Sequence, residues 1–177
     1  IEGLKIYNPN TPVVLITLII LVVIFVMQQF GTSFIGKFFG PVMVLWFLIL
    51  GGFGAYRILE HPEIFKALNP YYAYQLITTS PQIIIILGAV FLCTTGAEAL
   101  YSDLGHCGAK NIRISWFFVK VMLILNYLGQ GAWLIDNYKQ VFNGVNPFFG
   151  MMPDWFILPS VIFATAAAII ASQALIT

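Results

Sequence analysis

Residues 82–104 read QIIIILGAVFLCTTGAEALYSDL, and this stretch decides how the chain folds. Its first half is an unbroken apolar run, which is typical of a helix that crosses a lipid bilayer. Its second half places the carboxyl group of Glu98 where such a helix should stay apolar. A charged side chain at bilayer depth costs about 2.5–3.5 kcal/mol on insertion scales, and it persists mainly where it faces a cavity, a partner or an ion. We therefore expect a membrane helix in which Glu98 has a functional role.

The composition of the whole chain points to the same class of protein. Of its 177 residues, 60% are hydrophobic and only 8% are charged. A small soluble domain needs about a quarter of its surface charged, which this chain cannot supply. The fold class that we expect is an all-α, polytopic membrane helix bundle. A net charge of +1 excludes nucleic acid and acidic substrates as partners, and no motif predicts a cofactor.

Five apolar segments reach or approach the roughly 20 residues that cross the hydrocarbon core. They are residues 13–30, 41–59, 82–104, 112–135 and 155–176, within a single transmembrane domain covering residues 1–177. Pro12 and Pro41 stand at or just before the expected helix starts, where a missing N–H costs nothing. The chain has no initiator Met or signal peptide and is still apolar at its last residues, so we expect an internal piece of a longer protein.

The charges of the loops predict an orientation. The connections at residues 31–40 and 102–115 carry an excess of Lys and Arg, and the positive-inside rule places them in the cytoplasm. Residues 60–81 and 136–154 then face outside. In the first outer loop, residues 61–68 and 69–76 are expected to form two short helices, the second capped by Asn69. The tyrosines of the second helix favour anchoring at the lipid headgroups over a role in an ion entrance.

The chemistry of the third span lies at Thr94, Thr95, Gly96 and Glu98. A helix opens most easily at glycine, and interrupted helices in transporters free carbonyl oxygens that coordinate cations. Thr95 and Glu98 are three residues apart, so they share a helix face and offer a hydroxyl and a carboxylate to one hard cation.

Simpler explanations remain open for these residues. Thr94 and Thr95 can donate hydrogen bonds to carbonyl groups one turn earlier. Glu98 can be a protonated acid that holds two helices together. A metal site from Asp103, His106 and Cys107 is disfavoured, because adjacent His and Cys do not form the spaced clusters that metals require.

Two other polar or small-residue patterns indicate close helix packing. Gly51, Gly52 and Gly54 would let a neighbouring helix approach the second span. In the fourth span, residues 126–131 read NYLGQG and favour interhelical hydrogen bonds with close packing, with the lining of a water-filled path as the alternative. Lys120 is expected to extend toward the cytoplasmic interface.

Four motifs in order are specific enough to indicate a family: NPYYA at residues 69–73, LGAVFL at 87–92, TGAEALYSDLGH at 95–106 and LNYLGQGA at 125–132. Together with shorter matches along the rest of the chain, they closely resemble the Kup/HAK/KT potassium uptake family. The resemblance implies a twelve-helix transporter of the amino acid/polyamine/organocation superfamily, with a LeuT-like inverted-repeat fold. This chain resembles its helices four to eight, and the third span would be the discontinuous sixth helix.

The function implied by this resemblance is secondary active potassium uptake in the plasma (inner) membrane, coupled to H⁺ as a symport. Thr95 and carbonyl groups near Gly96 would replace the hydration oxygens of K⁺, and Glu98 would bind or relay the proton. The expected partners are K⁺, H⁺, the lipid bilayer and the remaining helices of the transporter, with a homodimer left open. The alternatives are a passive cation channel and a structural subunit of a membrane enzyme complex; an enzyme is not expected.

Overall fold

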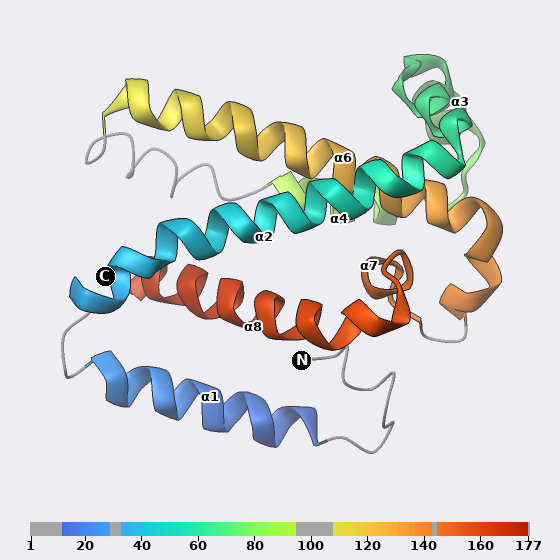
Figure 1. The fold of residues 1–177 in the computed structure, drawn as a ribbon. Coiled ribbons are helices and arrows are strands. Elements are labelled where there is room, and N and C mark those ends of the chain that lie inside the picture. Colours follow the sequence, from blue (N-terminus) through green and yellow to red (C-terminus); the bar gives the residue numbers. More distant parts are fainter. Residues whose placement is uncertain (1–11, 29–32, 95–107, 143–144, 177) are drawn as a thin grey trace.

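The computed structural model describes residues 12–28, 33–94, 108–142 and 145–176, and every regular element in these ranges is a helix. In chain order the helices are α1 (Val13–Gln28), α2 (Ser33–Glu60), the 3-10 helix η2 (Pro62–Leu68), α3 (Pro70–Thr79), α4 (Ile83–Thr94), α6 (Ala109–Phe142), α7 (Pro147–Gly150) and α8 (Asp154–Ile176). The prediction of an all-helical chain is confirmed for this part of the molecule (Figure 1).

Three of the described helices are long and apolar enough to cross a membrane. The qualifying segments are Phe39–Glu60 in α2, Ala109–Asn137 in α6 and Asp154–Ser172 in α8. Two further apolar segments, Val13–Val22 and Ile83–Leu92, are shorter. Most side chains of the three long segments are not buried within the chain. A membrane helix bundle explains this pattern, because lipid and not water then contacts the exposed apolar surface.

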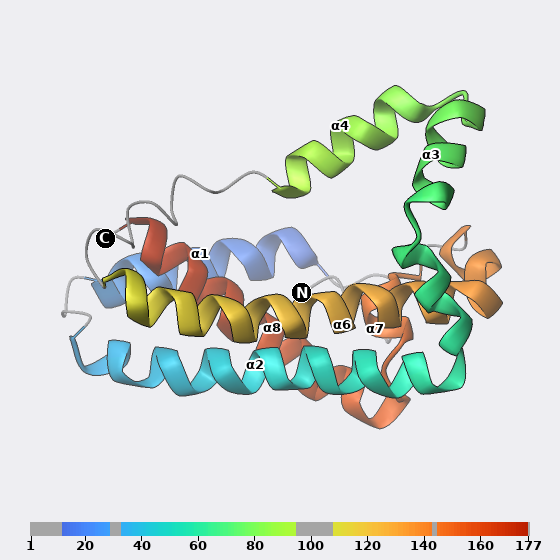
Figure 2. The same ribbon diagram turned by 90° about the horizontal axis from the view of Figure 1, so that it is seen from above.

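The long helices run side by side (Figures 1 and 2). Helix α6 packs along α2, and α8 packs against α2 in the opposite direction. Consequently, one end of the bundle brings together the end of α2, the end of α6, α7 and the start of α8. We call it the η2 end, because η2 directly follows α2 there. Helices α3 and α4 stand away from the other helices in Figure 2.

The start of α2 differs from the prediction. Pro41 was expected at or just before a helix start, but α2 begins at Ser33 and contains Pro41. Proline has no N–H to donate to the preceding turn and usually ends or kinks a soluble helix. Membrane helices accept it more readily, since neighbouring groups satisfy the freed carbonyl. Pro12 does directly precede α1, and its carbonyl accepts from the N–H of Ile16 at 3.1 Å.

The two short helices predicted for residues 61–76 are present in the structure. Pro62 opens η2, and Asn69 caps α3 because its Oδ1 accepts from the N–H of Tyr71 at 3.0 Å. Asparagine is among the preferred residues at this position, since its side chain satisfies a donor that has no helical partner. Tyr71, Tyr72 and Tyr74 are exposed.

The hydrophobic core lies at the η2 end. Trp133 from α6 packs with Met151 and Met152, and Phe149 packs with Ile157 and Val161 of α8. Aromatic rings connect the helices, with 4.8 Å between the ring centroids of Phe53 and Phe156. Such pairs add about 0.5–1.5 kcal/mol to the burial of their surface. This core fixes α2, α6 and α8 relative to one another.

Candidate functional site

Helix α4 leads directly to the predicted ion site. Its twelve residues form an apolar helix that ends at Thr94. Thr95, Gly96 and Glu98 lie outside the described residues, as does the side chain of Thr94. The predicted interruption of this helix and the role of its ion-binding residues therefore stay predictions.

The side chains of α4 that precede the predicted site are apolar and mostly exposed. Ile84, Ile85, Phe91 and Leu92 are all strongly exposed. No polar side chain precedes Thr94 in α4, since its sequence is IIIILGAVFLCT. The helix therefore has no charged or amide group of its own with which to hold an ion before Thr94.

The closest helix contact in the described chain is the crossing of α2 and α6. A Cβ atom at Gly54 would lie 2.8 Å from the Cα of Asn126, and a Cβ at Gly129 would lie 2.7 Å from the carbonyl oxygen of Gly54. Gly51 likewise faces Met122. The predicted close packing is confirmed for Gly51, Gly54 and Gly129. Gly52 differs, because no atom lies within 4 Å of the Cβ position there.

Asn126 lies in this crossing and is only 5% exposed. Its Oδ1 has no hydrogen-bond partner among the described residues. An unsatisfied buried acceptor costs about 1–3 kcal/mol. The close packing predicted here is therefore present, but Oδ1 of Asn126 makes no interhelical hydrogen bond within the described ranges.

A polar network surrounds Arg57 at the η2 end of the bundle. Its Nε–H donates to the carbonyl of Met151 at 2.8 Å, and its Nη1 lies 2.7 Å from Oε2 of Glu60. The first bond joins α2 to the residues between α7 and α8. Hydrogen bonds that involve a charged group contribute about 1.5–3 kcal/mol, whereas exposed ion pairs contribute about 0–1 kcal/mol. The contact with Met151 thus dominates the role of Arg57 in holding the fold.

His61 provides a second link at this end. Its Nε2 lies 2.9 Å from Oδ2 of Asp136 in α6, and its Nδ1 lies 3.8 Å from Oε1 of Glu63. An imidazole N–H can donate to a carboxylate whether the ring is neutral or protonated. His61 therefore connects the end of α2 and η2 to α6.

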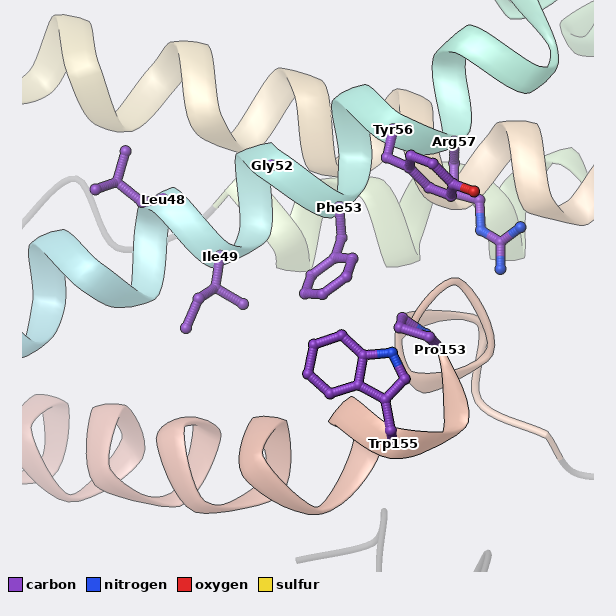
Figure 3. Close-up of a pocket in the computed structure, with 8 residues that line it drawn as sticks. All are labelled: Leu48, Ile49, Gly52, Phe53, Tyr56, Arg57, Pro153 and Trp155. Atoms are coloured by element: carbon purple, nitrogen blue, oxygen red, sulfur yellow. The ribbon is translucent and has the colours of Figure 1, made fainter.

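A cavity of about 640 Å³ opens between α2 and the start of α8 (Figure 3). Its lining consists of Leu48, Ile49, Gly52, Phe53, Tyr56, Arg57, Pro153 and Trp155. Arg57 and Tyr56 lie toward the η2 end, Leu48 and Ile49 line the opposite half, and Phe53 and Trp155 lie between them. A smaller hollow of about 180 Å³ lies between α1 and α8.

Two polar side chains of the membrane helices satisfy themselves locally. The ammonium of Lys120 lies 5.0 Å from the centre of the Trp116 ring, one turn toward the start of α6. This direction is the one expected if Lys120 extends to the cytoplasmic interface. The hydroxyl of Ser172 donates to the carbonyl of Ala168 at 2.8 Å, within its own helix.

No group of three or more His, Cys, Asp or Glu side chains in the described ranges could hold a metal ion. Asp103, His106 and Cys107, whose metal site was disfavoured from spacing, lie outside these ranges. At the η2 end, Arg57, Glu60, His61 and Asp136 instead pair with one another or with the backbone.

Comparison with known proteins identifies the family of this chain. All of residues 1–177 match the K⁺ potassium transporter integral membrane domain. The chain belongs to the Kup/HAK/KT potassium transporter family. This is a family of transporters and not of enzymes. The chain is accordingly an integral membrane protein, as its apolar helices indicate.

Several relatives are similar to this chain over its whole length. A protein of Cytophaga hutchinsonii is 54% identical, one of Flavobacterium johnsoniae is 52% identical, and one of Streptococcus agalactiae serotype V is 53% identical. Each is named "Probable potassium transport system protein Kup". The chain covers 28% of the length of each of these relatives. No solved structure matches it.

Sequence reasoning missed the network at the η2 end. Arg57 stands in a run of apolar and small residues, and its main partner is a backbone carbonyl 94 positions later, which no local pattern reveals. The pairing of His61 with Asp136 likewise joins the end of α2 to α6, at two positions that are distant in sequence. The available signal was the position of Arg57 near the end of a membrane span, where a positive charge needs an interface or an acceptor.

Proposed function

We propose that the full-length protein carries out secondary active uptake of K⁺ across the plasma (inner) membrane, coupled to H⁺ as a symport. The observation that carries the proposal is the family match over all 177 residues, together with relatives named as potassium transport proteins at 52–54% identity. This chain supplies five membrane segments of that transporter, within a LeuT-like inverted-repeat fold.

The ion site in this proposal follows α4. Thr94, Thr95 and the backbone around Gly96 bind K⁺ through hydroxyl and carbonyl oxygens, which replace its hydration shell. The carboxyl of Glu98 accepts and releases the coupled proton, because an ionisable group within a membrane segment is suited to a proton relay.

The Glu98→Gln variant tests the proton role in the full-length protein. A bacterium without its own potassium uptake systems grows at low K⁺ only when a functional transporter is supplied. We expect the wild type to restore growth and Glu98→Gln to abolish the rescue, because glutamine has a similar shape but cannot carry the proton. Immunoblotting of the membrane fraction verifies that both proteins are present.

The control is Glu63→Gln, which removes a carboxyl of η2 that is exposed and outside the proposed ion site. It should restore growth like the wild type. Full rescue by Glu98→Gln, with the same pH dependence as the wild type, would refute the proton role. A passive cation channel would instead restore growth after the proton gradient has been collapsed.

A further inference from the structure

The cavity between α2 and α8 has a polar end and an apolar end. Arg57 and Tyr56 lie toward one end, Leu48 and Ile49 line the other, and Phe53 and Trp155 face each other between them (Figure 3). Tyr56 is 57% exposed and Trp155 is 73% exposed, so both rings are accessible at the rim. A ligand that fits must therefore combine a polar head with an apolar chain.

The polar end lies at the depth of a membrane interface. Arg57 stands three residues before the end of the segment Phe39–Glu60, and Trp155 is the second residue of the segment Asp154–Ser172. Tyrosine and tryptophan prefer the headgroup level of a bilayer. From there the apolar half extends toward the middle of the membrane.

The length of the groove agrees with one acyl chain. Leu48 precedes Arg57 by nine residues of α2, which corresponds to about 14 Å along the helix axis. Half of a typical hydrocarbon core is about 15 Å thick. Gly52 lies between these two residues and leaves the groove open, because no atom lies within 4 Å of its Cβ position.

The guanidinium of Arg57 is held in place at the polar end. Its Nε is bound to Met151 and its Nη1 to Glu60, and no described residue accepts from Nη2. With Nε and Nη1 engaged, the N–H groups of Nη2 remain to donate a charge-assisted hydrogen bond to a phosphate. Pairing with Glu60 leaves the group as a hydrogen-bond donor at the rim.

We propose that this groove binds a phospholipid, with its phosphate on Arg57 and an acyl chain along Leu48, Gly52 and Phe53. The proposal is independent of the ion that the transporter carries. We favour a lipid over a helix from the rest of the protein for three reasons. The cavity has a hydrogen-bond donor suited to a phosphate, aromatic side chains at its rim, and a groove as long as an acyl chain that starts at the depth of the membrane interface. The lipid belongs to the leaflet at the η2 end.

Native mass spectrometry of the full-length protein in mild detergent tests this site. Phosphatidylglycerol is added to the delipidated protein, and the bound lipids are counted. Gly52→Leu fills the groove, whereas Gly40→Leu places the same side chain at another open position of α2. We expect Gly52→Leu to bind one phosphatidylglycerol fewer than the wild type, and Gly40→Leu to equal the wild type.

A second pair of variants applies if Gly52→Leu does not assemble. Leu48 and Leu45 are both exposed on α2, at 47% and 45%, but only Leu48 lines the cavity. Leu48→Trp should also lose one lipid, and Leu45→Trp should not. Equal lipid counts for Leu48→Trp and the wild type would overturn the proposal. So would a failure of both groove variants to assemble while both controls remain intact, which would place a protein helix in the groove.

Discussion

At the scale of single residues, the crossing of α2 and α6 depends on two glycines. Gly54 and Gly129 contact each other through their backbones, and a Cβ on either one would overlap the opposite helix. The same crossing buries Asn126. Membrane helices are not driven together by the hydrophobic effect, because the surrounding lipid is as apolar as their side chains. Small residues such as glycine hold them together instead, since they let the two backbones pack closely.

This contact predicts a difference between two substitutions on one helix. Gly54→Ala should destabilise the full-length protein by about 1–3 kcal/mol, since α6 must move to accommodate the new methyl group. Gly52→Ala should be neutral or slightly stabilising, because its Cβ position is empty and alanine favours the helix by about 1 kcal/mol. Thermal unfolding of the purified variants measures both effects. Equal melting temperatures for Gly54→Ala and Gly52→Ala would contradict the close contact between α2 and α6 at Gly54.

The sequence could not separate these two glycines. Gly51, Gly52 and Gly54 all look equally suited to close packing, but the helix turns Gly52 toward the cavity and the other two toward α6. The same limit applies to Arg57, whose acceptor on Met151 is distant in the chain. Local patterns record which residues are small or charged, but the rotation of one helix against another depends on the whole packed core.

At the scale of elements, local signals were most reliable where a side chain bonds to its own backbone. Asn69 was predicted as the cap of a short helix and does cap α3. The predicted start of α2 was wrong, because proline is tolerated inside membrane helices more readily than inside soluble ones. The span predicted at residues 82–104 is helical over its described part, Ile83–Thr94.

The cap on α3 leads to a second prediction. Asn69→Ala should destabilise this helix by about 1 kcal/mol, because the N–H of Tyr71 loses its acceptor. Hydrogen exchange measured by mass spectrometry should become faster in α3 and remain unchanged in α6. Gln75→Ala, an exposed change in the same helix that leaves the cap intact, is the control. Unchanged exchange in Asn69→Ala would mean that packing, and not the cap, holds α3.

At the scale of the whole molecule, the described helices bury little of their apolar surface against one another. The chain spans 28% of the length of its relatives, and the exposed faces of α1 and α4 are the surfaces on which the remaining helices or lipid would pack. The all-helical membrane character followed from composition and segment length. The arrangement of the proposed ion site does not follow from these features, because Thr95, Gly96 and Glu98 lie outside the described residues.

The central claim is that a proton on Glu98 drives K⁺ uptake, and net K⁺ accumulation in proteoliposomes tests it most directly. The full-length protein is reconstituted with equal K⁺ concentrations inside and outside, and an inward proton gradient is imposed. The account predicts that K⁺ accumulates together with acidification of the lumen, that both stop when the gradient is collapsed, and that Glu98→Gln shows neither. K⁺ accumulation by Glu98→Gln at the wild-type rate, or no accumulation by the wild type under the gradient, would contradict it.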